Sequence, residues 1–344
     1  MNICFNFDFF VSVAYHTGPK RSNDGQSVRD SFKPQEVANL IWAFATLNCQ
    51  PKSSLLHTFS PYILHICASG KKNGTFMYDE ESISKKFNRQ ELANIAWSCA
   101  VLEQYPPDLI PLLYTGLIGT GEDDENIDRM TKLYNDNGLQ KKAIMSLLYV
   151  QMALDLEAPH LNMRLPYKLL DMWGDQDDSI FAIDGNNGEN DLMLLSTSKL
   201  QTSVSKVFEK IGFSHVQEHV LGTDTLKEHG ITLTSSPLNF LSIDIANIES
   251  RVGIEVDGPS HFINILDEYR EDSKGSKMQD LKSGRMWLFE WDGDRQVNGP
   301  TGLKHRLLTH LGWRIIHIPF WEWNTLDSEE SQNEYCKKLL ESDD

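Results

Sequence analysis

The sequence has few cysteines and no long apolar run. Its 344 residues include 5 cysteines, and no two of them stand in a CxxC pair or at a zinc-finger spacing, which speaks against a disulfide framework or a zinc module. Three of them lie in apolar, helix-like surroundings, as is typical of buried free thiols in a reducing compartment. No stretch approaches the roughly 20 consecutive apolar residues that cross a bilayer, so we expect no membrane insertion. The cysteines are Cys4, Cys49, Cys67, Cys99 and Cys336.

The chain also lacks an excess of positive charge. Its 32 Lys and Arg residues face 49 Asp and Glu residues, and the net charge is −17. This is the wrong sign for a protein that holds phosphates with its whole surface. The acidic residues gather at 121–128, 171–191 and 327–344, as in solvated loops and a tail. A local basic strip remains, formed by Lys274, Lys277, Lys282, Arg285, Lys304 and Arg306.

A recognisable leader segment is missing as well. Residues 1–14 are apolar and aromatic, but the basic residues follow this run instead of preceding it, unlike a secretory signal. The segment is also not the Arg- and Ser-rich, acid-free sequence of an organelle transit peptide. We expect residues 1–30 to be poorly ordered, and residues 171–196 to form an acidic linker.

The first half of the chain contains an internal repeat. Residues 32–47 and 87–102 share Phe, Gln, Glu, Ala, Asn, Trp, Ala and Leu at matching places. Each copy reads as a helix that is apolar on two sides, which is typical of a helix packed between neighbours in a stack of helical hairpins. Further helices are expected at 55–68, 108–118 and, less regularly, 139–156.

These helices predict an all-α array over residues 31–170. We expect Trp42 and Trp97 to be core residues of that array, and the charged, glycine-containing stretch 70–86 to be a loop between its units. Polar residues recur at i and i+4 on one face of each repeat helix, where they would either contact a ligand or bond the neighbouring hairpin. They are Gln35, Asn39, Gln90 and Asn94.

The repeat resembles the octotricopeptide-type helical repeat, whose signature is Pro-Gln-Glu-x-Ala-Asn-x-x-Trp-Ala-x-Ala. The second copy departs from it at Arg89, where the proline is missing. The resemblance implies an RNA-binding α-solenoid in which Gln35, Asn39, Gln90 and Asn94 face the nucleotides.

After residue 196 the pattern changes to mixed helices and strands. A helix stopped by Gly212 comes first, then a short strand and a hairpin, and later a helix stopped by Gly312 and a strand closed by Pro319. Helices are predicted at 200–211, 301–311 and up to about 340, and strands at 218–222, 241–246, 252–257, 286–291 and 313–319.

The hairpin carries the chemistry of this half. Alternation places Leu241, Ile243 and Ile245 on one face of the first strand, and Asp244, Glu255 and Asp257 together on the other face, with His261 after the Gly258–Pro259 turn. Clustered carboxylates repel unless they are compensated. Either a divalent cation with oxygen ligands or pairing with Arg and Lys would do this.

The order of these elements is that of the PD-(D/E)XK nuclease-like core. The segment Glu255-Val-Asp-Gly-Pro-Ser-His261, followed by the Leu-Gly-Trp entry into the strand at 313–319, closely resembles the RAP domain, an RNA-binding domain abundant in apicomplexans. The FAST-kinase-domain family of mitochondrial RNA regulators shares that domain. The resemblance implies two domains, an N-terminal helical repeat over 31–170 and a C-terminal α/β RAP domain over 197–342.

The resemblance also assigns chemistry to the hairpin. In active PD-(D/E)XK nucleases two acidic residues on consecutive strands hold magnesium, and Asp244 and Glu255 stand at those places. The lysine that normally follows is replaced by Asp257, so Lys304 would supply the positive charge and His261 would act as acid or base. The implied catalytic set is Asp244, Glu255, Asp257 and His261, and Lys304 and Arg306 are further candidates for contacting RNA.

Three functions fit these patterns. The first is an RNA-binding protein of organellar RNA metabolism, mitochondrial with a plastid as alternative, which acts in transcript processing or stability together with other RNA-processing proteins. The second is a Mg²⁺-dependent endoribonuclease. The third is a helical-repeat scaffold that binds proteins, which the acidic balance favours. Cleavage that depends on Mg²⁺ separates the second from the first, and a salt-dependent interaction with RNA separates the first from the third.

Overall fold

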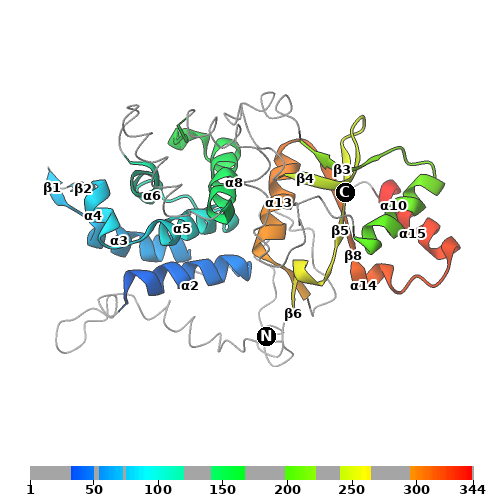
Figure 1. Cartoon of the computed structure of the whole chain (residues 1–344), viewed down its shortest axis with the longest axis horizontal. Coiled ribbons are helices and arrows are strands. Elements are labelled where there is room, and N and C mark those ends of the chain that lie inside the picture. Colours follow the sequence, from blue (N-terminus) through cyan, green and yellow to red (C-terminus); the bar gives the residue numbers. More distant parts are fainter. Residues whose placement is uncertain are drawn as a thin grey trace, which may run out of the picture. The chain divides into compact units, whose positions relative to one another are not determined.

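The computed structural model describes residues 32–49, 54–72, 75–119, 141–166, 198–221, 241–264 and 295–342. They fall into two compact units, one formed by the described residues up to 166 and one by those from 198 onwards (Figure 1). The expectations for residues 1–30, 171–196 and 286–291 lie outside the described ranges. Within those ranges, every helix is too short or too polar to span a bilayer.

The first unit is helical at the predicted places. The two repeat copies form α2 and α5, each followed by a partner helix, and the weaker third unit begins with α8 (Figure 1). The bounds are α2 Pro34–Thr46, α3 Leu55–Cys67, α5 Arg89–Val101, α6 Leu109–Ile118 and α8 Lys141–Glu157, with a short 3-10 turn at Pro159–Leu161.

The repeated glutamate is explained by helix capping. The backbone N–H of Asn88 donates to Glu91 Oε2 at 2.9 Å, and Glu91 N donates to Asn88 Oδ1 at 2.9 Å. In the first copy Lys33 N donates to Glu36 Oε2 at 2.9 Å. The Glu of each copy therefore satisfies a donor that the start of a helix leaves unpaired.

The first helices of the three units pack side by side. Helix α5 lies between α2 and α8, while α3 packs on α2 and α6 on α5. The small residues Ala38 and Ala45 of α2 are fully buried, and small buried side chains let neighbouring helices approach closely. We call α2, α5 and α8 the three-helix layer.

The stretch 70–86 is not the predicted loop. It holds an antiparallel hairpin of β1 (Gly70–Lys72) and β2 (Thr75–Met77), in which Gly70 pairs with Met77, and then helix α4 (Glu80–Ser84). Asp79 starts α4 by accepting a hydrogen bond from Ser82 N at 2.7 Å. The Asn-Gly pair at 73–74 is a strong hairpin signal, and the prediction gave more weight to the charges around it.

Trp42 is not a core residue. It is 44% exposed, while Ala38 and Ala45 of the same helix are buried. Trp42 lies on the same side of α2 as Gln35 and Asn39, which are exposed as well. We call this solvent-facing side of a helix its outer line. The prediction that Trp42 is a core residue is wrong for this reason.

The second unit is a four-stranded mixed sheet with helices on both faces. The strand order is β3-β4-β5-β8, with antiparallel β3–β4 and β4–β5 pairs and a parallel β5–β8 pair. The strands are β3 Val216–Val220, β4 Ser242–Asn247, β5 Val252–Asp257 and β8 Arg314–Pro319. The helices are α10 Lys199–Lys210, α13 Gly299–His310, α14 Phe320–Trp323 and α15 Glu329–Glu341, and a short ribbon joins β6 Phe262–Asn264 to β7 Arg295–Val297.

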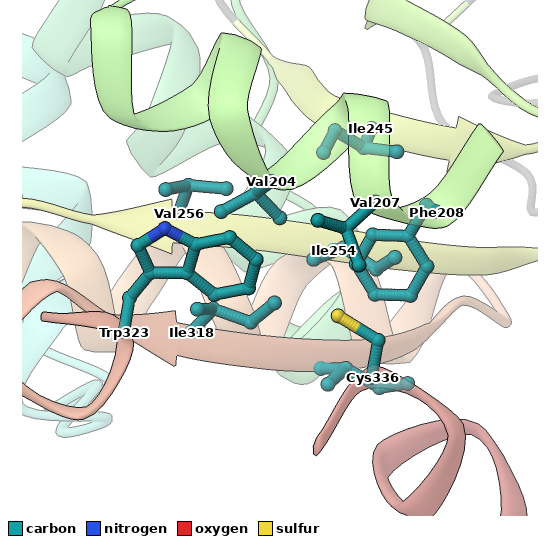
Figure 2. Packing of buried hydrophobic residues seen from close by; sticks show 10 residues of the cluster. Val204, Val207, Phe208, Ile245, Ile254, Val256, Ile318, Trp323 and Cys336 are labelled. Carbon is teal, nitrogen blue, oxygen red and sulfur yellow. The ribbon is translucent and has the colours of Figure 1, made fainter. Parts of the chain in front are cut away.

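The core of this unit lies between one sheet face and α10 and α15 (Figure 2). Each fully buried aliphatic or aromatic side chain contributes about 1.5–3 kcal/mol to folding. Because this face of β5 and β8 carries the even-numbered apolar residues, their odd-numbered residues point to α13. The core residues are Val204, Val207, Phe208, Ile245, Ile254, Val256, Ile316, Ile318, Trp323 and Cys336.

The alternation along β4 breaks at Asp244. In the β3–β4 ladder Gln217 pairs with Ile245 and His219 with Ile243, but Glu218 and Asp244 between them do not pair. Glu218 has a φ of 51°, in the left-handed region. Gln201 of α10 fills the gap, because its Nε2 donates to Glu218 Oε1 at 2.8 Å and to the carbonyl of Asp244 at 3.2 Å.

This irregularity separates Ile243 from Ile245. Ile245 packs in the α10–α15 core, whereas Ile243 lies on the opposite side, 2.9 Å from where a Cβ on Gly253 would stand. The prediction that Ile243 and Ile245 share a face is therefore wrong, because strict alternation does not continue through a strand whose ladder is interrupted.

Candidate functional site

The site lies on the α13 face of the sheet, where β5 and β8 end together. These two strands are parallel, and their register places Glu255 beside His317 and Asp257 beside Pro319. Parallel strands bring their carboxyl ends to the same edge of a sheet. The helix α13, which connects the ribbon to β8, adds Lys304 and His305 from above.

Lys304 compensates the charge of Glu255. Its Nζ donates to Glu255 Oε2 at 2.6 Å. Glu255 is 4% exposed, and burial raises its pKa to about 8, against the opposing effect of the Lys304 charge. The other carboxylate oxygen, Oε1, is buried without a hydrogen-bond partner in the described part of the chain.

Asp244 stands next to this pair. Its Oδ2 accepts a hydrogen bond from Val256 N at 2.8 Å, so the side chain replaces a backbone acceptor on the neighbouring strand. Burial raises the pKa of Asp244, while the charge of Lys304 and the Val256 N–H act in the opposite direction. The charge of Lys304 acts on both carboxyl groups, the charge of Asp244 makes Glu255 harder to ionise, and the charge of Asp257 does the same to Asp244.

Asp257 is the centre of a histidine cluster. It is 1% exposed, its Oδ2 lies 2.5 Å from His317 Nδ1, and its Oδ1 lies 3.1 Å from His261 Nδ1. Burial acts to raise the pKa of Asp257, but the bond from His317 and the charges of both histidines and Lys304 together outweigh it and lower the pKa. Asp257 is thus the carboxylate that stays ionised.

His305 extends the histidine cluster beyond His317. Its Nδ1 lies 2.9 Å from His317 Nε2. Burial and the neighbouring His317 lower the pKa of His305 to about 3, so this imidazole is neutral. His317 thus bridges the two groups, with Nδ1 facing Asp257 and Nε2 facing His305.

His261 is the side of the cluster that solvent reaches. Its side chain is 38% exposed, against 24% for Lys304 and 3% for His317. Asn298 at the start of α13 fixes the loop, because its Nδ2 donates to Ser260 O at 2.7 Å and its N to His261 O at 2.9 Å. Thr301 Oγ1 lies 3.1 Å from His261 Nδ1.

A second cluster lies just beyond the loop. The guanidinium of Arg295 lies 4.3 Å from the ring centroid of Trp321, and Trp321 meets Phe262 at 4.4 Å in an edge-to-face arrangement. A cation held over an indole in this way is attracted by the ring quadrupole and pre-oriented. The ribbon β6–β7 is thereby attached to the end of β8.

The predicted catalytic residues come together. Asp244 and Glu255 share Lys304, and Asp257 contacts His261. Three further members, His305, His317 and Thr301, were not predicted. The signal for His317 was a single polar residue inside an otherwise apolar strand, but its position beside Glu255 follows from the parallel register, which the sequence does not show.

The candidates for RNA contact differ in position. Gln35, Asn39 and Gln90 are exposed and Asn94 is half-buried. Gln90 Nε2 donates to Asn94 Oδ1 at 2.8 Å. Arg306 is 9% exposed, so it offers RNA little surface, and we do not propose it as a contact below.

The residues fit a bound Mg²⁺ only in part. Among the described residues no group of three or more His, Cys, Asp or Glu side chains is arranged to hold a metal ion. Asp244 and Glu255 Oε1 are two oxygen donors, and magnesium sites often combine one or two carboxylates with water and substrate phosphates. Lys304, however, already neutralises this pair.

Comparison with known proteins finds a family match within the second unit. Residues 254–339 match the RAP domain family. The chain is also 23% identical over 327 residues to a protein from Oryza sativa subsp. japonica named RAP domain-containing protein, chloroplastic. That alignment covers 90% of this chain and 41% of the relative, so the chain spans about two fifths of the rice protein's length.

The match contains most of the site. Glu255, Asp257, Lys304 and the histidine cluster fall within the matched residues, and Asp244 lies ten positions before them. The RAP resemblance expected from the Glu-Val-Asp-Gly-Pro-Ser-His segment is confirmed. Residues 254–339 of this chain are a RAP domain, a kind of domain that generally binds RNA.

Proposed function

We propose that this protein binds single-stranded organellar transcripts and acts in their processing or stability. The observation that carries the proposal is the RAP domain at 254–339. The helical repeat supports it, because it places exposed amide side chains on successive packed helices in the manner of RNA-binding repeat proteins.

The compartment is part of this proposal. The composition of the sequence indicates a reducing compartment, and the rice relative is named chloroplastic. We propose an organelle, for which the relative's name supports a plastid and the FAST-kinase-domain resemblance a mitochondrion. Fluorescence microscopy of the tagged full-length protein, with markers for both organelles, decides between them, and a uniformly cytosolic signal would contradict the proposal.

We propose a PD-(D/E)XK-like core for the second unit and a solenoid for the first. Support for the core comes from the chain order α10, β3, β4, β5, α13, β8 and from the parallel β5–β8 pair. Asp244 and Glu255 on consecutive strands, with Lys304 bound to Glu255 and its charge acting on Asp244, add to it. The side-by-side packing of α2, α5 and α8 supports the solenoid.

Crosslinking tests the function directly. The tagged full-length protein is crosslinked to RNA in cells, purified under denaturing conditions, and the attached RNA is sequenced. We expect organellar transcripts to be enriched over a tag-only control. Recovery of no RNA above that control would reject RNA binding, and recovery of cytosolic transcripts alone would reject the organellar role.

A second candidate function is a metal-dependent endoribonuclease. The observation that favours it is the buried, unpartnered Oε1 of Glu255 beside Asp244. If bound there, Mg²⁺ would polarise a phosphoryl oxygen, and Asp244 and Glu255 would hold it. His261, oriented by Asp257, would hold or release a proton at its exposed ring.

Cleavage assays separate this candidate from pure binding. The full-length protein is incubated with end-labelled RNA, with Mg²⁺ or with EDTA, alongside Asp244→Ala and Glu255→Ala. Cleavage that requires Mg²⁺ and disappears in both variants would establish the nuclease. Unchanged RNA under all conditions, with binding retained, supports the binding function alone.

A further inference from the structure

The three helices of the layer carry equivalent aromatic residues at one position. Trp42 of α2 and Trp97 of α5 match through the sequence repeat, and α8 supplies Tyr149. From 146 to 155 the buried and half-buried positions coincide one by one with those from 94 to 103, and Tyr149 then stands where Trp97 stands. We call Trp42, Trp97 and Tyr149 the aromatic row.

The row lies on the outer line of its helices. Trp42 is 44% exposed, and Trp97 and Tyr149 are half-buried while the positions on both sides of each are buried. In α5, which has neighbours on both sides, this line is where a side chain can reach solvent. Trp42 is one of the few large hydrophobic side chains exposed in the described part of the chain, and two further aromatic residues that solvent partly reaches stand at the equivalent places of α5 and α8.

Amides accompany the aromatics. Asn39 and Gln35 precede Trp42 by three and seven positions, and Asn94 and Gln90 precede Trp97 in the same way. Residues at these spacings share one face of a helix, and helical side chains lean towards the N-terminus, so each indole leans towards its amides. The bond from Gln90 Nε2 to Asn94 Oδ1 uses one donor and one acceptor of this pair, so the Gln90 carbonyl oxygen and the Asn94 NH₂ group are not engaged by that bond.

The line of amides and aromatics on α2 and α5 is uncharged. Uncharged side chains do not neutralise phosphates. A contact made through them is therefore compatible with a chain whose net charge is −17. Unpaired bases are the part of RNA that such a line can contact, because every base has a face that stacks on an aromatic ring and an edge that bonds amides. Neighbouring packed helices are about 8–10 Å apart. The aromatic residues of neighbouring helices are therefore far enough apart for each to stack on a different base.

We propose that the aromatic row stacks successive unpaired bases of a single RNA strand, one base per helix, with the amides of α2 and α5 bonding the base edges. This inference rests on the proposed RNA-binding function and names the part of the strand that the helical unit contacts. It assigns base stacking to the first unit and leaves phosphate contacts to other parts of the chain.

The test uses the full-length protein and fluorescein-labelled 12-nucleotide poly(U) and poly(A), with a duplex of the same length as competitor. The variants are Trp42→Ala, Trp42→Phe and Tyr149→Ala, and Met77→Ala is the control because Met77 is 49% exposed and lies outside the row. Thermal unfolding of each variant is measured in parallel. Trp42→Phe keeps a stacking ring, so it separates stacking from bulk.

We expect Trp42→Ala to weaken the binding of single strands about 5- to 100-fold, the effect of losing one stacked base. Trp42→Phe should stay within about threefold of wild type, and Met77→Ala should not change affinity. The loss caused by Trp42→Ala should be similar at 50 and 200 mM salt, because stacking releases no counterions.

The two proposals fail in different ways. If the wild type binds neither poly(U) nor poly(A), nor the transcripts recovered by crosslinking, the RNA-binding function fails. If the wild type binds but Trp42→Ala and Tyr149→Ala bind equally well while remaining folded, the aromatic row is not the site. Equal competition by the duplex also overturns the inference, because paired bases offer no free face.

Discussion

Lys304 Nζ lies 2.6 Å from Glu255 Oε2, although the two residues are 49 positions apart in the sequence. The lysine comes from helix α13 and the glutamate from strand β5. This pair supplies positive charge next to the acidic residues Asp244 and Glu255. It also joins α13 to the centre of the sheet.

Lys304→Met should destabilise the protein. It leaves the 4% exposed Glu255 without its counter-charge, and breaking a buried ion pair on one side costs about 3 kcal/mol or more. Because Glu255 holds a proton in the folded protein below pH 8 and Lys304 is itself 24% exposed, we expect a smaller loss of about 1.5–3 kcal/mol at neutral pH, the value of a hydrogen bond to a charged group. Urea unfolding measures the change. The control is Lys338→Met, which breaks the surface pair with Glu334 and should cost no more than about 0.5 kcal/mol.

Glu255→Gln should alter how stability depends on pH. The pKa of Glu255 is raised from 4.5 to about 8 in the folded protein, so between these values the folded state holds a proton that the unfolded state has released. The contribution is therefore present below pH 4.5 and is lost as pH rises through 8. Relative to Glu255→Gln, the wild type should lose up to about 1.4 kcal/mol of unfolding free energy per pH unit in this window.

The unfolding free energies of the wild type and of Glu255→Gln have to be compared at each pH. His305, with a pKa lowered to about 3, contributes in the opposite direction between pH 3 and 6.5, and that contribution is common to wild type and variant. Unfolding curves at half-unit intervals from pH 4.5 to 8.5 give the difference. Parallel curves for the two proteins would show that Glu255 ionises normally in the folded state.

Asp257→Asn should destabilise by about 1.5–3 kcal/mol, the value of a hydrogen bond to a charged group. The variant keeps the shape of the side chain but removes the charge that faces His317 and His261. Chemical denaturation measures the loss. Asp327→Asn, at an exposed position, is the matched control and should stay within about 0.5 kcal/mol. A loss confined to RNA binding, with unchanged stability, would contradict a structural role for Asp257.

Gly253→Ala should cost about 1–3 kcal/mol through overpacking. The added Cβ would lie 2.7 Å from Ile315 Cδ1 and 2.9 Å from Ile243 Cγ2. Gly258→Ala, where a Cβ meets nothing within 4 Å, is the control for the loss of a glycine. Ile315→Val removes the closest atom, so in the Gly253→Ala background it should restore part of the stability. If the losses of Gly253→Ala and Ile315→Val simply add in the double mutant, the strain does not come from the contact between these two side chains.

Local patterns predicted much of this fold. The repeat predicted α2 and α5 to within two residues, because their apolar positions follow the helical period. The strand at 313–319 and its preceding helix follow from Gly312 and Pro319. What the sequence missed depends on partners that are distant in the chain. His317 lies beside Glu255 only because β8 is parallel to β5.

The errors share a cause, which is the assumption that a period continues unchanged. Ile243 and Ile245 were placed on one face because strands alternate, but the gap at Glu218 and Asp244 resets the alternation. Trp42 was placed in the core because it is large and apolar. Its helix buries small alanines instead, and the indole lies on the outer line with the amides.

The position of Asp257 affects how inherited or engineered substitutions at this residue should be interpreted. A single carboxylate is shared by two imidazoles, one from the loop after β5 and one from β8. A cell that carries an altered Asp257 would degrade more of the loosened protein, and its abundance would fall before any transcript is affected. A phenotype from such an allele therefore has to be normalised to protein level before it is assigned to chemistry at the site.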